Sequence, residues 1–169
     1  MSLVFPNLTK VRLIDVNPRS EVHGDVKVPA LDLRFQTEMP NQVLLLLHPQ
    51  LREHIYEESK QVALPGVDDV SDLTELRFPE LAAPFKWTEE SGGNTLTIDY
   101  GIGGESSILF TDCKLHKQAF LPKRGGTCLV SFTVTATQGL TAHEVGHMGI
   151  RVQHDMHILL RAAEPIADV

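Results

Sequence analysis

Residues 127–137, which read TCLVSFTVTAT, alternate between apolar side chains and small polar ones. The apolar face would carry five residues, Cys128, Val130, Phe132, Val134 and Ala136. A period of two is typical of a β-strand that buries one of its faces. This segment therefore requires a core that is built on at least one sheet.

The same alternation recurs at residues 26–39, and a shorter first strand is expected at residues 11–15. Residues 85–104 predict a hairpin whose turn is formed by Gly92 and Gly93. Glycine is suited to such a turn because it adopts positive φ at little cost.

A turn at residues 122–126 is expected to join a strand that ends at Leu121 to the strand described first. Placing the apolar residues of both strands on one face requires Cys128 to oppose Leu121 or Ala119. Cys113 would then lie several residues away along the sheet, beyond the reach of a disulfide. We expect two free and largely buried cysteines.

The pattern changes at residues 40–59, which predict two short helices. Pro40 suits a first helical position, and Pro49 interrupts the segment. Residues 57–75 carry six acidic residues against one lysine and predict an acidic surface loop.

The whole chain, residues 1–169, is expected to form a single β-rich domain that ends in a tail at residues 163–169. The fold class is α+β and mainly β. The expected architecture is an antiparallel sheet sandwich or a partly open barrel with two or three short helices.

Residues 141–157 contain four of the eight histidines, and His143, Glu144 and His147 have the spacing His-Glu-x-x-His. On a helix, both imidazoles would share a face and could bind one zinc ion. Glu144 would then act as general base toward a zinc-bound water. With His154 as a further ligand, this segment predicts a zinc-dependent hydrolase as one alternative.

The same segment also has a structural interpretation. Thr141 followed by Glu144 is the pattern of a capping box, and Gly149 is a common end for a short helix. Residues 150–161 alternate and predict a final strand. The segment is similar to the zinc helix of metzincin peptidases, yet Gly149 and His154 each stand one place away from that pattern.

The net charge of −7 disfavours a protein whose whole surface attracts nucleic acid. One run is nevertheless basic and contains no acid. It comprises four candidate binding residues, Lys114, Lys117, Lys123 and Arg124. This run could hold a phosphate backbone or an acidic protein, whereas a solvated hairpin face is the structural alternative.

Residues 98–134 contain the strings YGIGGES, DCK and GGT in that order. They resemble a family of small accessory proteins of temperate bacteriophages that is found near phage recombination genes. The resemblance implies an accessory role in phage DNA metabolism or in countering host defences.

We therefore predict a non-enzymatic, phage-type accessory protein that binds a macromolecule and needs no cofactor. The expected partner is a protein or nucleic acid of the phage or its host, and the protein could also form a homo-oligomer. No membrane segment or signal peptide is visible, so the expected location is the cytoplasm of the bacterial host. Zinc is the cofactor only under the hydrolase alternative.

Overall fold

The structure is a computed structural model that describes residues 2–59, 73–81, 83–99 and 107–164. Its strands are β1 (Phe5–His23), β2 (Val26–Pro40), β3 (Tyr56–Glu58), β4 (Leu73–Leu76), β5 (Phe85–Trp87), β6 (Ser91–Asp99), β7 (Ser107–Lys123), β8 (Thr127–Ala136) and β9 (Asp155–Arg161). Its helices are the 3-10 helix η1 (Asn41–Leu46) and the α-helices α1 (Leu51–Ile55) and α2 (Ala142–Gly149).

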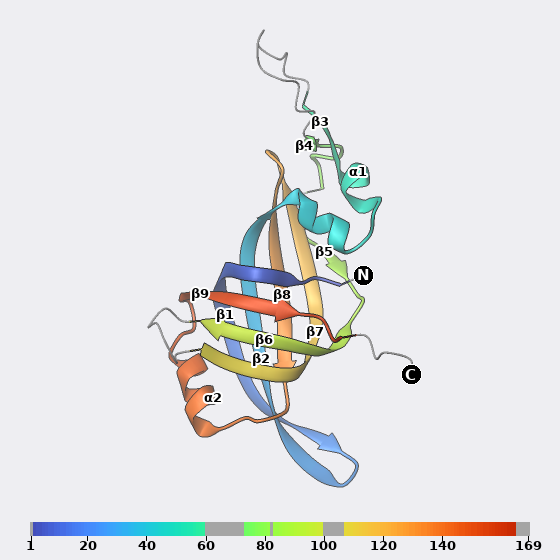
Figure 1. The fold of residues 1–169 in the computed structure, drawn as a ribbon. Coiled ribbons are helices and arrows are strands. Elements are labelled where there is room, and N and C mark those ends of the chain that lie inside the picture. The colour runs from blue at the N-terminus through green and yellow to red at the C-terminus, as the bar shows by residue number, and fades with distance from the viewer. Residues whose placement is uncertain (1, 60–72, 82, 100–106, 165–169) are drawn as a thin grey trace.

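Six of the described strands close into an antiparallel barrel. Their order is β7, β6, β9, β1, β2 and β8, and the pairing of β8 with β7 closes the ring (Figure 1). The mainly β, antiparallel fold class is confirmed, and the barrel is closed rather than partly open. Closure is possible because the long β7 pairs with β6 along one edge and with β8 along the other.

The barrel core is formed by the inward faces of these strands. The five apolar residues expected to share one face of β8 are all fully buried, which confirms that prediction. Phe132 lies at the centre of an aromatic cluster, with ring centroids 5.4 Å from Phe5 and 5.5 Å from Phe35. The alternation of the sequence thus places a polar face of β8 on the outside of the barrel.

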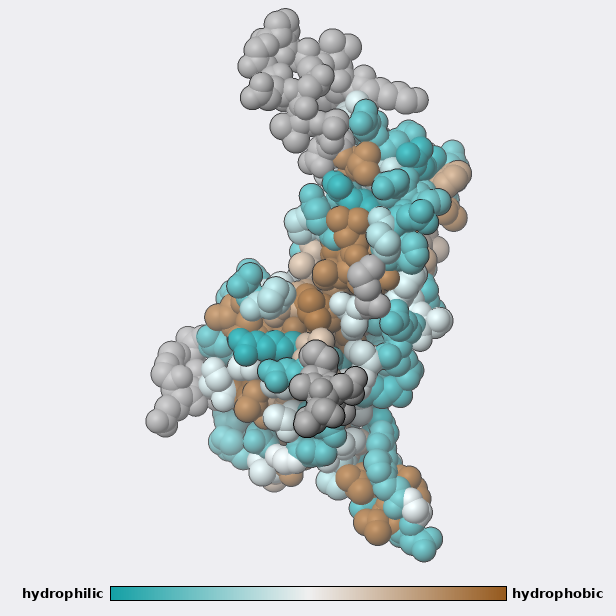
Figure 2. Space-filling model, turned by 45° about the vertical axis from the view of Figure 1, so that its right-hand side comes forward, coloured by the Kyte–Doolittle hydropathy of each residue, from teal (hydrophilic) through white to brown (hydrophobic). Residues whose placement is uncertain are grey.

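Beyond the barrel, β1 and β2 continue as a two-stranded arm (Figure 1). β1 pairs with β9 as far as Arg12, and β2 pairs with β8 only from Leu31 onward. Near the tip, Val22 and Val26 are 69% and 63% exposed. Figure 2 shows that apolar side chains gather at the lower end of the molecule.

The hairpin expected at residues 85–104 is wrong. Gly92 and Gly93 lie inside β6, where the register with β7 shifts between Ser91 and Asn94. β5 and β6 pair with successive parts of the same edge of β7 and not with each other. Of that segment, residues 100–104 lie outside the described part.

The predicted register of Cys128 is also wrong by one residue, because Cys128 pairs with Pro122. The cause is a bulge in β7 between His116 and Ala119. Beyond this bulge, the other alternating set of β7 side chains points into the barrel. Both cysteines are nevertheless free and buried, as expected.

Two segment predictions need correction. The acidic segment 57–75 is not wholly a loop, since its two ends form strands of the pair β3 and β4; residues 60–72 lie outside the described part. The final strand begins at Asp155 rather than at residue 150, because turns follow α2 and leave Ile150 72% exposed.

Two short helices do lie between β2 and β3, as expected. None of the described helices is long and apolar enough to cross a membrane.

Candidate binding groove

A groove of about 550 Å³ lies on the outer, polar face of the barrel. Its floor is formed by side chains that alternate with the buried residues of β2 and β8: Asp32, Arg34, Ser131 and Thr133. β1 contributes Asp15 and Asn17 to the groove. The remaining wall comes from β7, from β5 and from the segment that joins β5 to β6.

The β7 wall depends on the bulge in that strand. Lys117 has φ of 52°, a left-handed conformation that a residue with a side chain rarely adopts. Its two neighbours, His116 and Gln118, are both buried, whereas Lys117 is exposed and lines the groove. A strained backbone position of this kind occurs often at functional sites.

Three cations of the groove lack a carboxylate partner in the described part of the chain: Arg34, Lys86 and Lys117. The negative charges are mostly compensated. Asp32 is held by Arg19 and Glu90 by Lys114, whereas Asp15 makes no ion pair within the described residues. The groove therefore presents more available positive than negative charge.

Trp87, the only tryptophan of the chain, is half-buried: it packs partly against the hydrophobic core and also lines the groove. Its Nε1–H donates to Glu89 Oε2 over 3.3 Å. The adjacent Gln118 donates from Nε2 to the backbone oxygen of Glu89 over 2.9 Å, which ties the segment after β5 to β7. Glu89 therefore contacts the indole through its carboxylate and Gln118 through its backbone oxygen, and these two contacts position Trp87.

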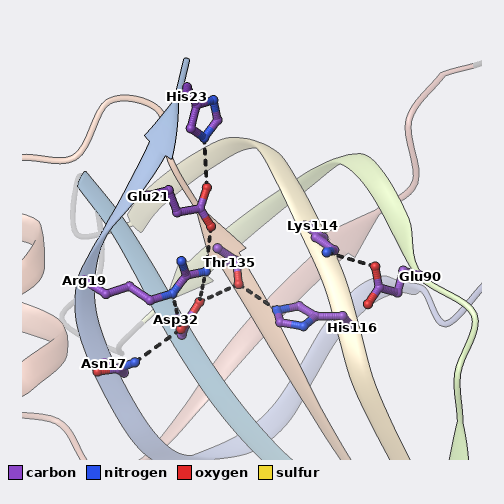
Figure 3. Close-up of polar contacts among 9 residues, drawn as sticks. All are labelled: Asn17, Arg19, Glu21, His23, Asp32, Glu90, Lys114, His116 and Thr135. Atoms are coloured by element: carbon purple, nitrogen blue, oxygen red, sulfur yellow. Dashed lines mark hydrogen bonds and ion pairs between the residues drawn. The ribbon is translucent and has the colours of Figure 1, made fainter. Parts of the chain in front are cut away.

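Beside the groove, Asp32 is the centre of a network of hydrogen bonds (Figure 3). It accepts two bonds from Arg19, at 2.7 and 3.1 Å, one from Thr135 at 2.6 Å and one from Asn17 at 3.3 Å. Burial opposes ionisation of Asp32, but the bonds from Arg19 and Thr135 outweigh it and hold the pKa of this carboxyl below its usual value.

The network reaches β7 through His116, whose Nε2 lies 2.7 Å from Thr135 Oγ1 (Figure 3). Because the single hydroxyl hydrogen of Thr135 goes to Asp32, Nε2–H of His116 is the donor to Thr135. Burial, followed by the nearby Lys114 ammonium, lowers the pKa of His116. In the other direction, Arg19 contacts Glu21 at 2.7 Å.

The four basic residues predicted as a binding run do not form one free patch. Lys114 pairs with Glu90 at 2.8 Å, Lys123 with Glu38 at 2.7 Å and Arg124 with Glu75 at 3.4 Å. Lys114 and Lys123 are separated by a length of strand on the order of 30 Å. Lys117 alone of the four lines the groove.

The histidines predicted as zinc ligands lie on and after α2. His143 and His147 are adjacent, with ring centroids 4.4 Å apart. His154 lies in the following turn, where Nδ1 is 3.1 Å from the backbone oxygen of Val152. Among the residues that the structure describes, no three potential ligands of the His, Cys, Asp or Glu type are close enough to hold one metal ion.

The capping box is confirmed. Thr141 Oγ1 accepts from the backbone N–H of Glu144 over 3.4 Å, and Glu144 Oε2 accepts from the backbone N–H of Thr141 over 2.9 Å. The same carboxylate oxygen also accepts from the Thr141 hydroxyl. Glu144 therefore has a structural role at the start of α2.

Sequence reasoning missed most of the groove. The sequence shows Arg34 only as an outward residue of the strand expected at residues 26–39, and the hairpin expected at residues 85–104, which does not form, includes Lys86 and Trp87. The signal that could have found them is the sequence Phe-Lys-Trp, a cation beside the only tryptophan on a short strand.

The chain matches no protein-family model, and the searches of curated proteins and of solved structures returned no match.

Proposed function

We propose that the protein is a non-enzymatic accessory protein that binds a macromolecule in the outer groove of its barrel. The observation that carries the proposal is a set of three cations, Arg34, Lys86 and Lys117, that make no ion pair within the described residues and line one groove together with Trp87. Cations without an internal partner are available to an anionic ligand, and rigid strands hold them in place.

This proposal moves the binding site away from the basic hairpin. There, Lys123 and Arg124 already have carboxylate partners, which a ligand would have to displace. Exposed ion pairs of this kind are weak, but their carboxylates would still repel an anion. In the groove, Arg34, Lys86 and Lys117 make no ion pair with a carboxylate of the described residues, so a ligand would not have to displace one from them.

Binding of heparin, a general polyanion, tests the location of the site. We expect Arg34→Ala and Lys86→Ala to weaken binding several-fold at low salt, and Lys123→Ala to leave it nearly unchanged. Titration at several salt concentrations gives the number of ionic contacts. A loss on Lys123→Ala as large as that on Lys86→Ala would return the site to the hairpin and contradict the proposal.

The cellular role we propose is an accessory one in phage DNA metabolism or counter-defence, in the cytoplasm of a bacterial host. It rests on the resemblance of residues 98–134 to the phage family. A partner protein or nucleic acid from the phage or the host fits a groove of this kind.

A zinc-dependent hydrolase is the second candidate, favoured by the adjacent imidazoles of His143 and His147 on α2. His154 would have to leave its contact with Val152 to join them. Metal analysis of the purified protein separates the two candidates. Stoichiometric zinc that is lost on His147→Ala would favour the hydrolase.

A further inference from the structure

We infer that the macromolecule bound in the groove is single-stranded nucleic acid, with a base stacked on Trp87 and the backbone phosphates held by Arg34, Lys86 and Lys117. The inference rests on the proposed function and specifies its ligand. It follows from four features of the groove: its aromatic wall, the spacing of its cations, its hydroxyl floor and its carboxylates.

The aromatic wall lies beside the cations. Trp87 pairs with Gln118 across the β5–β7 ladder, and Lys86 pairs with Ala119. Lys117 directly precedes Gln118 in the chain, so one cation lies on each side of the Trp87–Gln118 pair. A base that stacks on the indole would thus place its own phosphate and a neighbouring one within reach of lysines.

The third cation lies across the floor. Arg34 pairs with Thr133 on β8, and Thr133 pairs with His116 on β7, next to Lys117. Two strand spacings separate β2 from β7, which corresponds to roughly 10 Å between the backbones of Arg34 and Lys117. Thr133 lies between the two cations in the ladder and lines the groove, so its hydroxyl can donate to a phosphate or a sugar.

The negative groups of the groove favour a nucleotide over an acidic peptide. Asp15 lies opposite Arg34 in the β1–β2 ladder but makes no ion pair within the described residues, and a carboxylate accepts hydrogen bonds from the amino groups of bases. An acidic peptide has no base amino group to donate to Asp15 and would leave the indole unused. A ligand with a flat ring, donor groups and phosphates matches all sides of the groove.

A single strand fits better than a duplex. The faces of bases within a duplex are covered by their neighbours, whereas an unpaired base can stack on an aromatic side chain. The groove volume of about 550 Å³ is that of a small-ligand site, which suits one or two nucleotides of a strand that runs through it. The net charge of −7 should make binding weak at physiological salt and strongly salt-dependent.

Fluorescence provides a direct test because Trp87 is the only tryptophan. A short oligodeoxynucleotide of mixed sequence is titrated as a single strand and as a duplex, in parallel with a glutamate-rich peptide. We expect the single strand to quench the indole and to bind with a log–log salt slope of about −2, from three phosphate contacts at about 0.7 each. Binding of labelled probes is also followed by anisotropy.

Three variants and one control define the contacts. Trp87→Ala should weaken single-strand binding between roughly fivefold and a hundredfold, by anisotropy, and Trp87→Phe should restore part of it. Lys117→Gly should reduce the salt slope by about 0.7, and it should not unfold the protein, because glycine favours the φ of 52° found there. Lys123→Ala, outside the groove, should bind as the unaltered protein does.

The outcomes separate this inference from the proposed function. Equal binding of the duplex, or binding of the glutamate-rich peptide that is lost in Lys117→Gly, would overturn the single-strand inference and leave groove binding intact. Absence of binding by every probe at low salt would overturn both. Single-strand binding that Trp87→Ala does not change would show that the bases are not stacked there and would also refute the inference.

Discussion

His116 and Thr135 lie on adjacent strands, with 2.7 Å between His116 Nε2 and Thr135 Oγ1. The Thr135 hydroxyl in turn donates a hydrogen bond to Asp32 Oδ1 over 2.6 Å. Thr135 therefore connects a buried imidazole on β7 to the ion pair of β1 and β2. This connection fixes the outer faces of four barrel strands relative to one another, directly beside the groove.

Removing the bridging hydroxyl should destabilise the protein. In Thr135→Val, the buried Nε2–H of His116 loses its acceptor and Asp32 loses a donor, and an unsatisfied buried group of this kind costs about 1–3 kcal/mol. Urea unfolding measures the change. Thr133→Val is the matched control, because Thr133 is buried on the same strand and its side chain has no hydrogen bond within the described residues. Equal losses in the two variants would contradict this role of Thr135.

The network should also make stability depend on pH. Burial lowers the pKa of His116 in the folded protein, so below the ordinary histidine value of about 6.5 the unfolded chain takes up a proton that the folded chain does not. The free energy of unfolding should therefore decrease as the pH falls through and below about 6.5. His116→Gln should show a shallower decrease in this range than the unaltered protein, as measured by urea unfolding at several pH values. An identical pH profile in the variant would contradict the prediction.

The strands with two unlike faces could be predicted from sequence, and the groove could not. Phe132 points into the barrel and Thr133 lies on its outer face, because the alternation along β8 allows only one of its two faces to be the apolar one. The bulge at Lys117 has no comparable signal, since a lysine is an unusual residue for positive φ. That bulge changes the face of β7, and the position of β5 and Trp87 depends on it. The ion pairs that neutralise Lys114 and Lys123 join distant segments, which periodicity does not specify.

Gly92 and Gly93 show how a local signal misled, and they offer a matched pair of variants. Gly93 has φ of 71°, and a Cβ added there would lie 3.0 Å from Cβ of Ala163, whereas Gly92 has open space and needs no positive φ. Gly93→Ala should therefore lower stability by more than about 1 kcal/mol, and Gly92→Ala should change it by much less. Thermal unfolding compares the two. A larger loss in Gly92→Ala would mean that the irregularity in β6 is not set by Gly93.

Tyr56 joins the short helical segment to the end of the β7–β8 hairpin. Its hydroxyl accepts from the backbone N–H of Lys123 over 3.0 Å and lies 2.9 and 3.1 Å from the backbone oxygens of Lys123 and Thr127. Tyr56→Phe keeps the buried ring and removes these bonds, so we expect a loss of about 1–3 kcal/mol in urea unfolding. Unchanged stability would show that water replaces the hydroxyl.

The start of α2 distinguishes the structural role of Glu144 from a catalytic one. Thr141→Ala removes the cap and should cost about 0.5–2 kcal/mol. Glu144→Gln keeps an oxygen that can accept from the Thr141 backbone, so it should retain most of the stability that Glu144→Ala loses. Thermal unfolding of the three variants, with and without a metal chelator, measures these effects. If the chelator lowers the stability of the unaltered protein as much as Thr141→Ala does, the histidines of α2 hold a metal and the cap alone does not account for the segment.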